Sequence, residues 1–173
     1  RLLVSATQSA PCGKTFYRLA QFYTKANRSE DAIRAFEEAK VREPRNVQNL
    51  RALGDAYRVA KRNEEAKRIY EIITELESGV YGKVRAMPEM IEAEFGYAHL
   101  GLADVATEER AYEEALGQYQ AAGVVFGEAW DHRDWEAYRG VSPLKRADWQ
   151  AKYQYLLERS EEHTSELQSQ FRI

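Results

Sequence analysis

Apolar residues in the first half of the chain recur with two periods, one of three to four residues and one of 34. Phe16, Leu19, Ala20 and Tyr23 stand at i, i+3, i+4 and i+7, which is one face of a helix. Eight such positions recur at one constant offset, from Phe16, Leu19, Ala20, Tyr23, Ala32, Phe36, Ala39 and Pro44 to Leu50, Leu53, Gly54, Tyr57, Ala66, Tyr70, Ile73 and Ser78. Such a period predicts stacked repeats in which no single unit buries its own apolar face.

Each repeat is predicted to be a helix, a short polar turn and a second helix. In the first repeat the turn lies at 25–30, where Asn27 or Ser29 is expected to cap the second helix. Pro44 is expected to end that helix, because it lacks an N–H group and crowds the preceding turn. Small residues at Ala20 and Gly54 predict close approach of the paired helices.

This pattern resembles the tetratricopeptide repeat, which reads aromatic or Leu, Leu, Gly or Ala, Tyr, Ala, aromatic, Ala and Pro at set spacings. Residues 13–46 match at all eight positions and residues 47–80 at six. The resemblance implies an all-α fold in which helix-turn-helix repeats stack as a right-handed α-solenoid with a C-terminal capping helix. It also implies a scaffold or adaptor that binds a peptide or partner protein in its concave groove, without catalysis.

A degenerate third unit is predicted at 81–129, in a register displaced from strict repetition. Pro88 with Glu89 after it favours a helix start, so the first helix of this unit is expected to be long, from about Pro88 to Ala106. His99 takes the aromatic position and is expected to pack there. The positions that fit the displaced register are Leu102, Ala103, Ala115, Tyr119 and Ala122.

A loop and a capping helix are predicted at 130–158. Ser142 and Pro143 are typical of a helix start, and an amphipathic pattern follows at Leu144, Trp149, Tyr153, Leu156 and Leu157. A solenoid needs a terminal element over its last apolar face, so 142–158 is the expected cap.

Both ends of the chain are interpreted as cut. Residues 159–169 resemble the translation of a common short-read sequencing adapter, so we interpret 159–173 as a non-native tail outside the fold. The chain begins with Arg1, and residues 1–12 are interpreted as a truncated linker or the end of a preceding unit. The protein is therefore expected to be a fragment of a longer reading frame.

Composition narrows the class of protein. The net charge is −3, and −2 without residues 159–173, which hold two Arg and three Glu. A chain so close to neutral is not expected to bind nucleic acid. There is no apolar run long enough to span a bilayer, and one cysteine, Cys12, excludes an internal disulfide framework.

Motifs for catalysis or metal binding are weak. Cys12, Gly13, Lys14 and Thr15 are similar to the end of a phosphate-binding loop, but that loop needs a glycine at position 8, which is Gln8. His132 lies between two aspartates without the further ligands that a metal site needs. We therefore expect no enzyme activity, no cofactor and no metal in this chain.

The resemblance places the groove on the first helix of each unit. In the first two units the expected partner-binding residues include four cations and one acid, which favours an acidic peptide, although a merely solvated face explains the charges equally well. The third unit offers Tyr97, Leu100, Asp104, Thr107 and Glu108, which is not a basic set. Tyr17, Gln21 and Ala52 stand where a carboxylate-clamp repeat needs Lys and Asn, so that clamp is not expected. The expected groove residues are Lys14, Tyr17, Gln21, Thr24, Lys25, Gln48, Arg51, Asp55 and Arg58.

Two other functions stay open. Residues 78–101 resemble repeat tails of bacterial O-antigen-ligase-type membrane proteins, which implies the soluble tail of a larger enzyme. Trp130 and Trp135 could instead serve a repeat domain that senses a small ligand. The compartment is cytoplasmic by default and periplasmic if the chain is such a tail.

Overall fold

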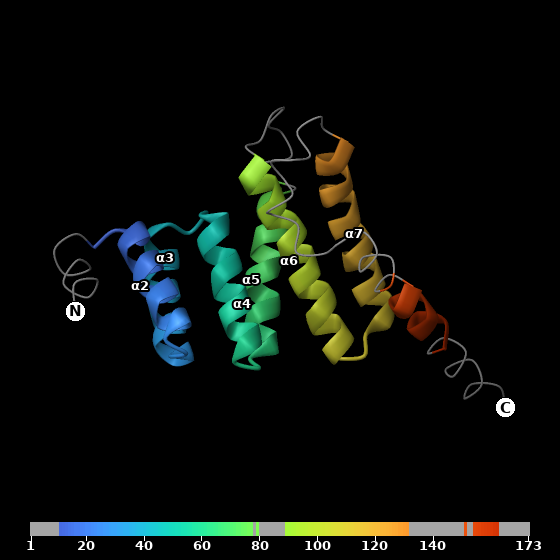
Figure 1. Ribbon diagram of the computed structural model, residues 1–173, viewed down its shortest axis with the longest axis horizontal. Coiled ribbons are helices and arrows are strands. Elements are labelled where there is room, and N and C mark those ends of the chain that lie inside the picture. The colour runs from blue at the N-terminus through green and yellow to red at the C-terminus, as the bar shows by residue number, and fades with distance from the viewer. Residues whose placement is uncertain (1–10, 78, 80–88, 132–150, 152–153, 163–173) are drawn as a thin grey trace. The chain divides into compact units, whose positions relative to one another are not determined.

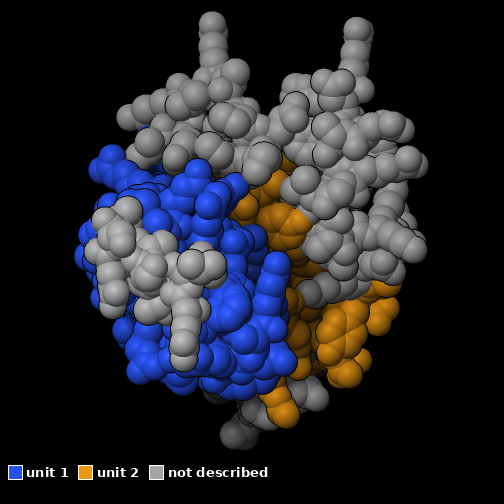
Figure 2. Space-filling view, turned by 60° about the vertical axis from the view of Figure 1, so that its left-hand side comes forward, with its two compact units in different colours: residues 1–85 blue, residues 86–173 orange. Residues whose placement is uncertain are grey.

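The computed structural model describes residues 11–77, 79, 89–131, 151 and 154–162. Within these ranges the chain is all-α, and no strand is present (Figure 1). The chain divides into two compact units, residues 1–85 and residues 86–173 (Figure 2). In each unit the helices pack against one another.

Four helices of nearly equal length lie in the described residues of unit 1. They are α2 (Gly13–Lys25), α3 (Ser29–Arg42), α4 (Val47–Val59) and α5 (Asn63–Leu76). The first and last residues of α4 and α5 lie one full repeat period after those of α2 and α3. The predicted helix-turn-helix arrangement is therefore confirmed for both pairs, and Pro44 follows the end of α3 as expected.

Small residues bring the helices of unit 1 together. Helix α2 packs on α3, α4 packs on α5, and α3 also packs on α4. Ala20, Ala32, Gly54 and Ala66 are all buried in these contacts. Because an alanine face leaves room for the opposite helix, each pair can approach closely enough to bury its larger side chains. Phe36, Tyr57 and Tyr70 are buried in that space, while Phe16 and Tyr23 are only half-buried.

The turn between α2 and α3 differs from the prediction. Neither Asn27 nor Ser29 caps α3, whose N-cap is Arg28 without a side-chain hydrogen bond. Asn27 has a φ of 56°, and the Arg28 N–H donates to the Tyr23 carbonyl over 2.9 Å. This is the Schellman arrangement that ends a helix, so the polar turn satisfies carbonyls of α2 and leaves the start of α3 without a side-chain cap.

The same turn occurs three times in the described chain. Lys61 and Arg110 have φ values of 59° and 62°, close to that of Asn27. At each site the next residue donates to the carbonyl five positions back, over 2.9 Å at the first two turns and 2.8 Å at the third. Asn27 and Lys61 are separated by one repeat period, whereas Arg110 lies further from Lys61 than that period. The third turn thus lies in the displaced register expected for the third unit.

An arginine stacks on a tyrosine beside the first two turns. The Arg28 guanidinium lies 4.7 Å from the centre of the Tyr23 ring, and Arg62 lies 4.6 Å from that of Tyr57. Such a cation over an aromatic face contributes about 0.5–1 kcal/mol at an exposed site. In the third turn the residue equivalent to Arg28 and Arg62 is Ala111. This turn therefore has the same backbone geometry but no arginine over an aromatic ring.

Unit 2 contains two longer helices, α6 (Glu89–Glu108) and α7 (Tyr112–Asp131). Helix α6 ends shortly beyond the predicted Ala106, and the predicted start at Pro88 lies outside the described residues. Helix α7 runs through Asp131, so the loop does not begin at residue 130 as predicted. Gly127 lies within this helix, and its cost of about 1 kcal/mol is too small to end the helix.

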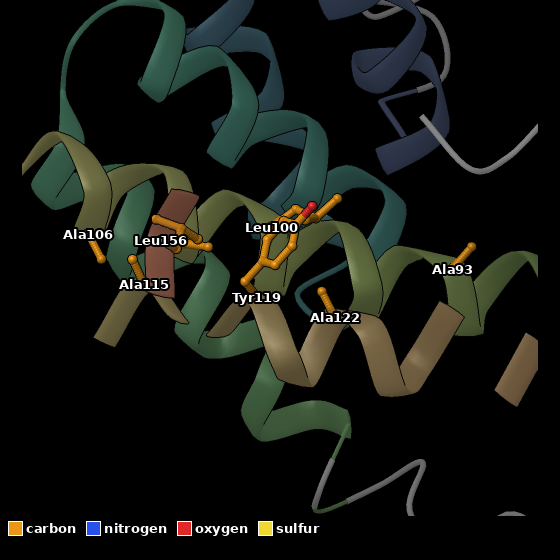
Figure 3. Close-up of a cluster of buried hydrophobic side chains, with 8 residues drawn as sticks. Ala93, Leu100, Ala106, Ala115, Tyr119, Ala122 and Leu156 are labelled. Carbon is orange, nitrogen blue, oxygen red and sulfur yellow. The ribbon is translucent and has the colours of Figure 1, made fainter. Parts of the chain in front are cut away.

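A third segment, residues 154–162, is helical and contributes one side chain to the core of unit 2. Its Leu156 is fully buried among side chains of α6 and α7 (Figure 3). Of the residues predicted to cap the fold, Leu144, Trp149 and Tyr153 lie outside the described part of the chain. The helix continues to residue 162 and does not stop at 158. The buried cluster consists of Ala93, Leu100, Ala103, Ala106, Ala115, Tyr119, Ala122 and Leu156.

Candidate functional site

A cavity of about 420 Å³ opens in unit 1, where α2, α3 and α4 meet. Helix α2 supplies polar side chains and the ring of Tyr17, and α4 supplies mostly small apolar ones. This volume lies in the range of about 300–1,000 Å³ that ligand pockets occupy. The lining residues are Tyr17, Gln21, Thr24, Lys25, Asn27, Ser29, Ala32, Phe36, Arg51, Ala52, Asp55, Ala56 and Val59.

A smaller cavity of about 290 Å³ adjoins the first. The two share Tyr17 and Gln21, whose side chains therefore stand between them. The residues that line the smaller cavity all have polar or charged side chains, and besides Tyr17 and Gln21 they are Lys14, Arg18, Glu43, Asn46 and Gln48. Together the larger and smaller cavities form what we call the α2–α4 groove.

Eight of the nine expected groove residues line one of these cavities. Lys14 and Gln48 line the smaller cavity, and Tyr17, Gln21, Thr24, Lys25, Arg51 and Asp55 line the larger one. Arg58 lines neither cavity.

Arg58 acts on the core of the second helix pair instead. Burial raises the pKa of the Tyr70 hydroxyl, the nearby Asp55 carboxylate raises it further, and Arg58 opposes both effects. Arg58 is itself half-buried. The position of Arg58 in the helical period is the same for a cation that faces the groove and for one that interacts with a buried hydroxyl on the neighbouring helix. The sequence pattern therefore could not separate the two.

The groove is less basic than its residue count predicts. Arg51 forms an ion pair with Asp55, with 2.5 Å between Nη1 and Oδ2. Asp55 also accepts a hydrogen bond of 2.7 Å from the Tyr70 hydroxyl. Because Arg51 is neutralised in this way, Lys25 is the cation of the larger cavity that has no carboxylate within ion-pair distance among the described residues.

Two polar contacts fix α4 against α3 behind the groove. The Tyr57 hydroxyl donates to Glu37 Oε1 over 2.7 Å, and Asn49 Nδ2 donates to the Phe36 carbonyl over 3.3 Å. Asn49 is only 1% exposed. Neither contact was predicted from the sequence. The position of Asn49 between Val47 and Leu50, on an apolar face, could have indicated a buried polar contact.

An aromatic pair supports the wall that the two cavities share. The rings of Tyr17 and Phe36 lie 5.7 Å apart between centroids and are tilted by 58°. Tilted pairs at this distance are favourable, because the positive edge of one ring faces the negative face of the other. The Tyr17 ring is therefore held in position by the core and not by solvent contacts alone.

The third-unit residues expected at the groove differ from one another in burial. Leu100 is only 8% exposed and belongs to the core of unit 2, and Tyr97 packs against that core. Thr107 is half-buried, with its hydroxyl donating to the Ala103 carbonyl over 2.6 Å. The expectation of a surface at Leu100 is wrong, because α6 is apolar on more than one side and buries the leucine against α7.

The described residues offer no metal centre, since no group of three or more His, Cys, Asp or Glu side chains converges there. His132 and Gln8 lie outside the described residues. His99 is half-buried, with Nδ1 placed 2.7 Å from Gln118 Oε1, so it packs between α6 and α7 as expected. Cys12 is exposed at the start of α2, and hydrogen bonding with Thr15, first with its backbone and then with its side chain, holds the pKa of the Cys12 thiol below the ordinary value.

No helix in the described ranges is both long and apolar enough to cross a membrane. No protein-family model matches the chain, and no curated protein matches it.

Proposed function

We propose that unit 1 is a protein-interaction module that holds a peptide, or an exposed segment of a partner protein, in the α2–α4 groove. The observation that carries this proposal is the larger cavity of about 420 Å³. It combines apolar side chains of α3 and α4 with polar side chains of which α2 supplies the largest share, which is the composition expected of a site for a flexible ligand with both kinds of group. No catalytic step is assigned to the chain.

The walls of the groove are suited to a peptide because they are prearranged. Tyr57, Asn49 and Asp55 each bond a neighbouring helix, so α4 cannot turn away without losing a polar contact. A preformed site avoids part of the ordering cost that binding otherwise incurs. Exposed Lys25 and Lys14 would speed the encounter with an acidic partner, with Tyr17 supplying contact area.

We also propose that the three helix pairs are tetratricopeptide-type units of a right-handed α-solenoid, with 154–162 as part of its capping helix. The support is the turn that recurs at Asn27, Lys61 and Arg110 with the same hydrogen bonds. Burial of Leu156 on α6 and α7 supports the cap. A solenoid is the usual way for such pairs to bury faces that no single pair can bury.

The test of peptide binding uses two exposed valines as a matched pair. Val59 lines the larger cavity and is 71% exposed, whereas Val41 lines neither cavity and is 74% exposed. Both can be replaced by Trp with little risk to the core. A random peptide library displayed on phage would be selected on the full chain, and the enriched peptides would be measured on Val59→Trp and Val41→Trp.

We expect peptides to be enriched, to lose at least tenfold in affinity on Val59→Trp, and to keep their affinity within twofold on Val41→Trp. Circular dichroism would establish that both variants fold. Enrichment of no peptide, or equal binding to both variants, would overturn the assignment of the groove.

A further inference from the structure

The two cavities of the groove differ in what they can hold. The larger one is lined by Ala32, Phe36, Ala52, Ala56 and Val59 in addition to its polar rim. The smaller one has no aliphatic side chain in its lining and carries two cations. A single ligand that fills both cavities must therefore present an apolar group to one and an anionic or polar group to the other.

The cations of the smaller cavity favour a carboxylate. Lys14 and Arg18 are both exposed side chains of α2, and Glu43 is the one acid among the lining residues. Glu43 already accepts a hydrogen bond of 2.8 Å from Asn46 Nδ2. Arg18 can bind a carboxylate through two parallel hydrogen bonds, and Lys14 adds a second positive charge.

The spacing of the cavities sets the spacing of the two groups. On α2 the larger cavity involves residues from Tyr17 to Lys25, and the smaller one those from Lys14 to Gln21. On α2, the residues that line the larger cavity are thus centred about one helical turn beyond those that line the smaller one, roughly 5.4 Å along the helix axis. Two residues of an extended chain span about 6.6 Å and place both side chains on the same side.

We propose that the ligand is an extended segment in which an apolar side chain and an acidic side chain stand at positions i and i+2, in either order. The apolar group enters the larger cavity, and Lys14 and Arg18 bind the carboxylate in the smaller one. Tyr17 and Gln21 separate the two sites and contact the residue between them. This inference rests on the proposed function of the groove and adds the chemistry of its ligand.

The test starts from the peptides enriched on the full chain. We expect them to share an apolar residue two positions from Asp or Glu. In the tightest peptide, replacing the acid by its amide should cost about tenfold in affinity for the wild-type chain. The same replacement should cost less than twofold for the double variant Lys14→Gln, Arg18→Gln. Arg68→Gln, an exposed arginine on α5 outside both cavities, is the matched control and should behave as the wild type.

Two results would overturn the inference while leaving the groove as a binding site. In the first, the peptides lose affinity on Val59→Trp, but replacing their acid by the amide weakens binding equally for the wild type and for the double variant. The other is enrichment of apolar and acidic residues at i and i+4, which a helical ligand would show. Failure to enrich any peptide sensitive to Val59→Trp would instead count against the proposed function itself.

Discussion

The ring of Tyr70 lies against the backbone of Gly54, at a distance that leaves no room for a side chain. A Cβ atom at position 54 would be 2.6 Å from Tyr70 Cε1. The tyrosine is fully buried, and its hydroxyl is anchored to Asp55 on the same helix as Gly54. The ring therefore cannot move aside without breaking this part-buried hydrogen bond.

Gly54→Ala should lower the free energy of unfolding by about 1–2 kcal/mol. Overpacking a filled core costs about 1–3 kcal/mol, and the better helix propensity of Ala returns up to about 1 kcal/mol. Urea unfolding followed by circular dichroism would measure the change. Gly117→Ala on α7 is the control, because a Cβ there meets nothing within 4 Å. It should raise stability by about 0.5–1 kcal/mol. If Gly54→Ala and Gly117→Ala both stabilised the protein, the Tyr70 ring would be able to move aside for a side chain at position 54.

Alkaline pH should weaken unit 1 through Tyr57. Burial, followed by the hydrogen bond to the Glu37 carboxylate, raises the pKa of Tyr57 to about 12 from 10.0. A group whose pKa is raised on folding stabilises the protein fully below its unfolded pKa, so this contribution is lost as pH rises from about 10 to about 12. The urea midpoint of the wild type should fall more steeply over this window than that of Tyr57→Phe.

Glu37→Gln separates the two causes of that shift. It keeps a hydrogen-bond acceptor for Tyr57 and removes the negative charge, so the steep fall should be reduced but not abolished, since burial remains the larger cause. Identical pH profiles for the wild type and Tyr57→Phe would contradict the assignment.

Lys61→Asn should stabilise the turn between α4 and α5. Lys61 has a φ of 59°, a left-handed conformation in which its Cβ is crowded. Asparagine tolerates this conformation better, and it already stands at the equivalent Asn27. We expect a gain of about 0.5 kcal/mol in the free energy of unfolding, within the usual effect of such turn substitutions. Lys61→Val should do the opposite, and a gain from valine would exclude the left-handed turn.

Leu156→Ala tests whether residues 154–162 belong to the fold. Leu156 is fully buried against α6 and α7, so its removal should cost about 2–5 kcal/mol. Tyr155→Ala is the neighbouring control, since Tyr155 is 46% exposed and should change stability by less than about 1 kcal/mol. Equal effects of the two changes would mean that the segment does not cover unit 2.

The repeat period predicted the local structure well. The helices of the second pair begin and end one period after those of the first, because an apolar stripe and a turn at fixed spacing are enough to specify where each helix lies. The long α6 was predicted from Pro88 and the acids after it. The caps at Asn27 and Ser29 were predicted wrongly, since a polar residue between two helices can serve the end of one as well as the start of the other.

The tertiary structure decided which of the groove residues act together. The helical period places Arg51, Asp55 and Arg58 on one face of α4, and it assigns all of them to the groove. Only the packed helices show that Asp55 neutralises Arg51 and bonds Tyr70, and that Arg58 lowers the pKa of the same hydroxyl. The partners of a side chain lie on other helices, and their positions depend on how closely small residues such as Gly54 let those helices approach. The sequence by itself therefore determined the elements and their faces, whereas the charge of the groove and its division into two cavities came from packing.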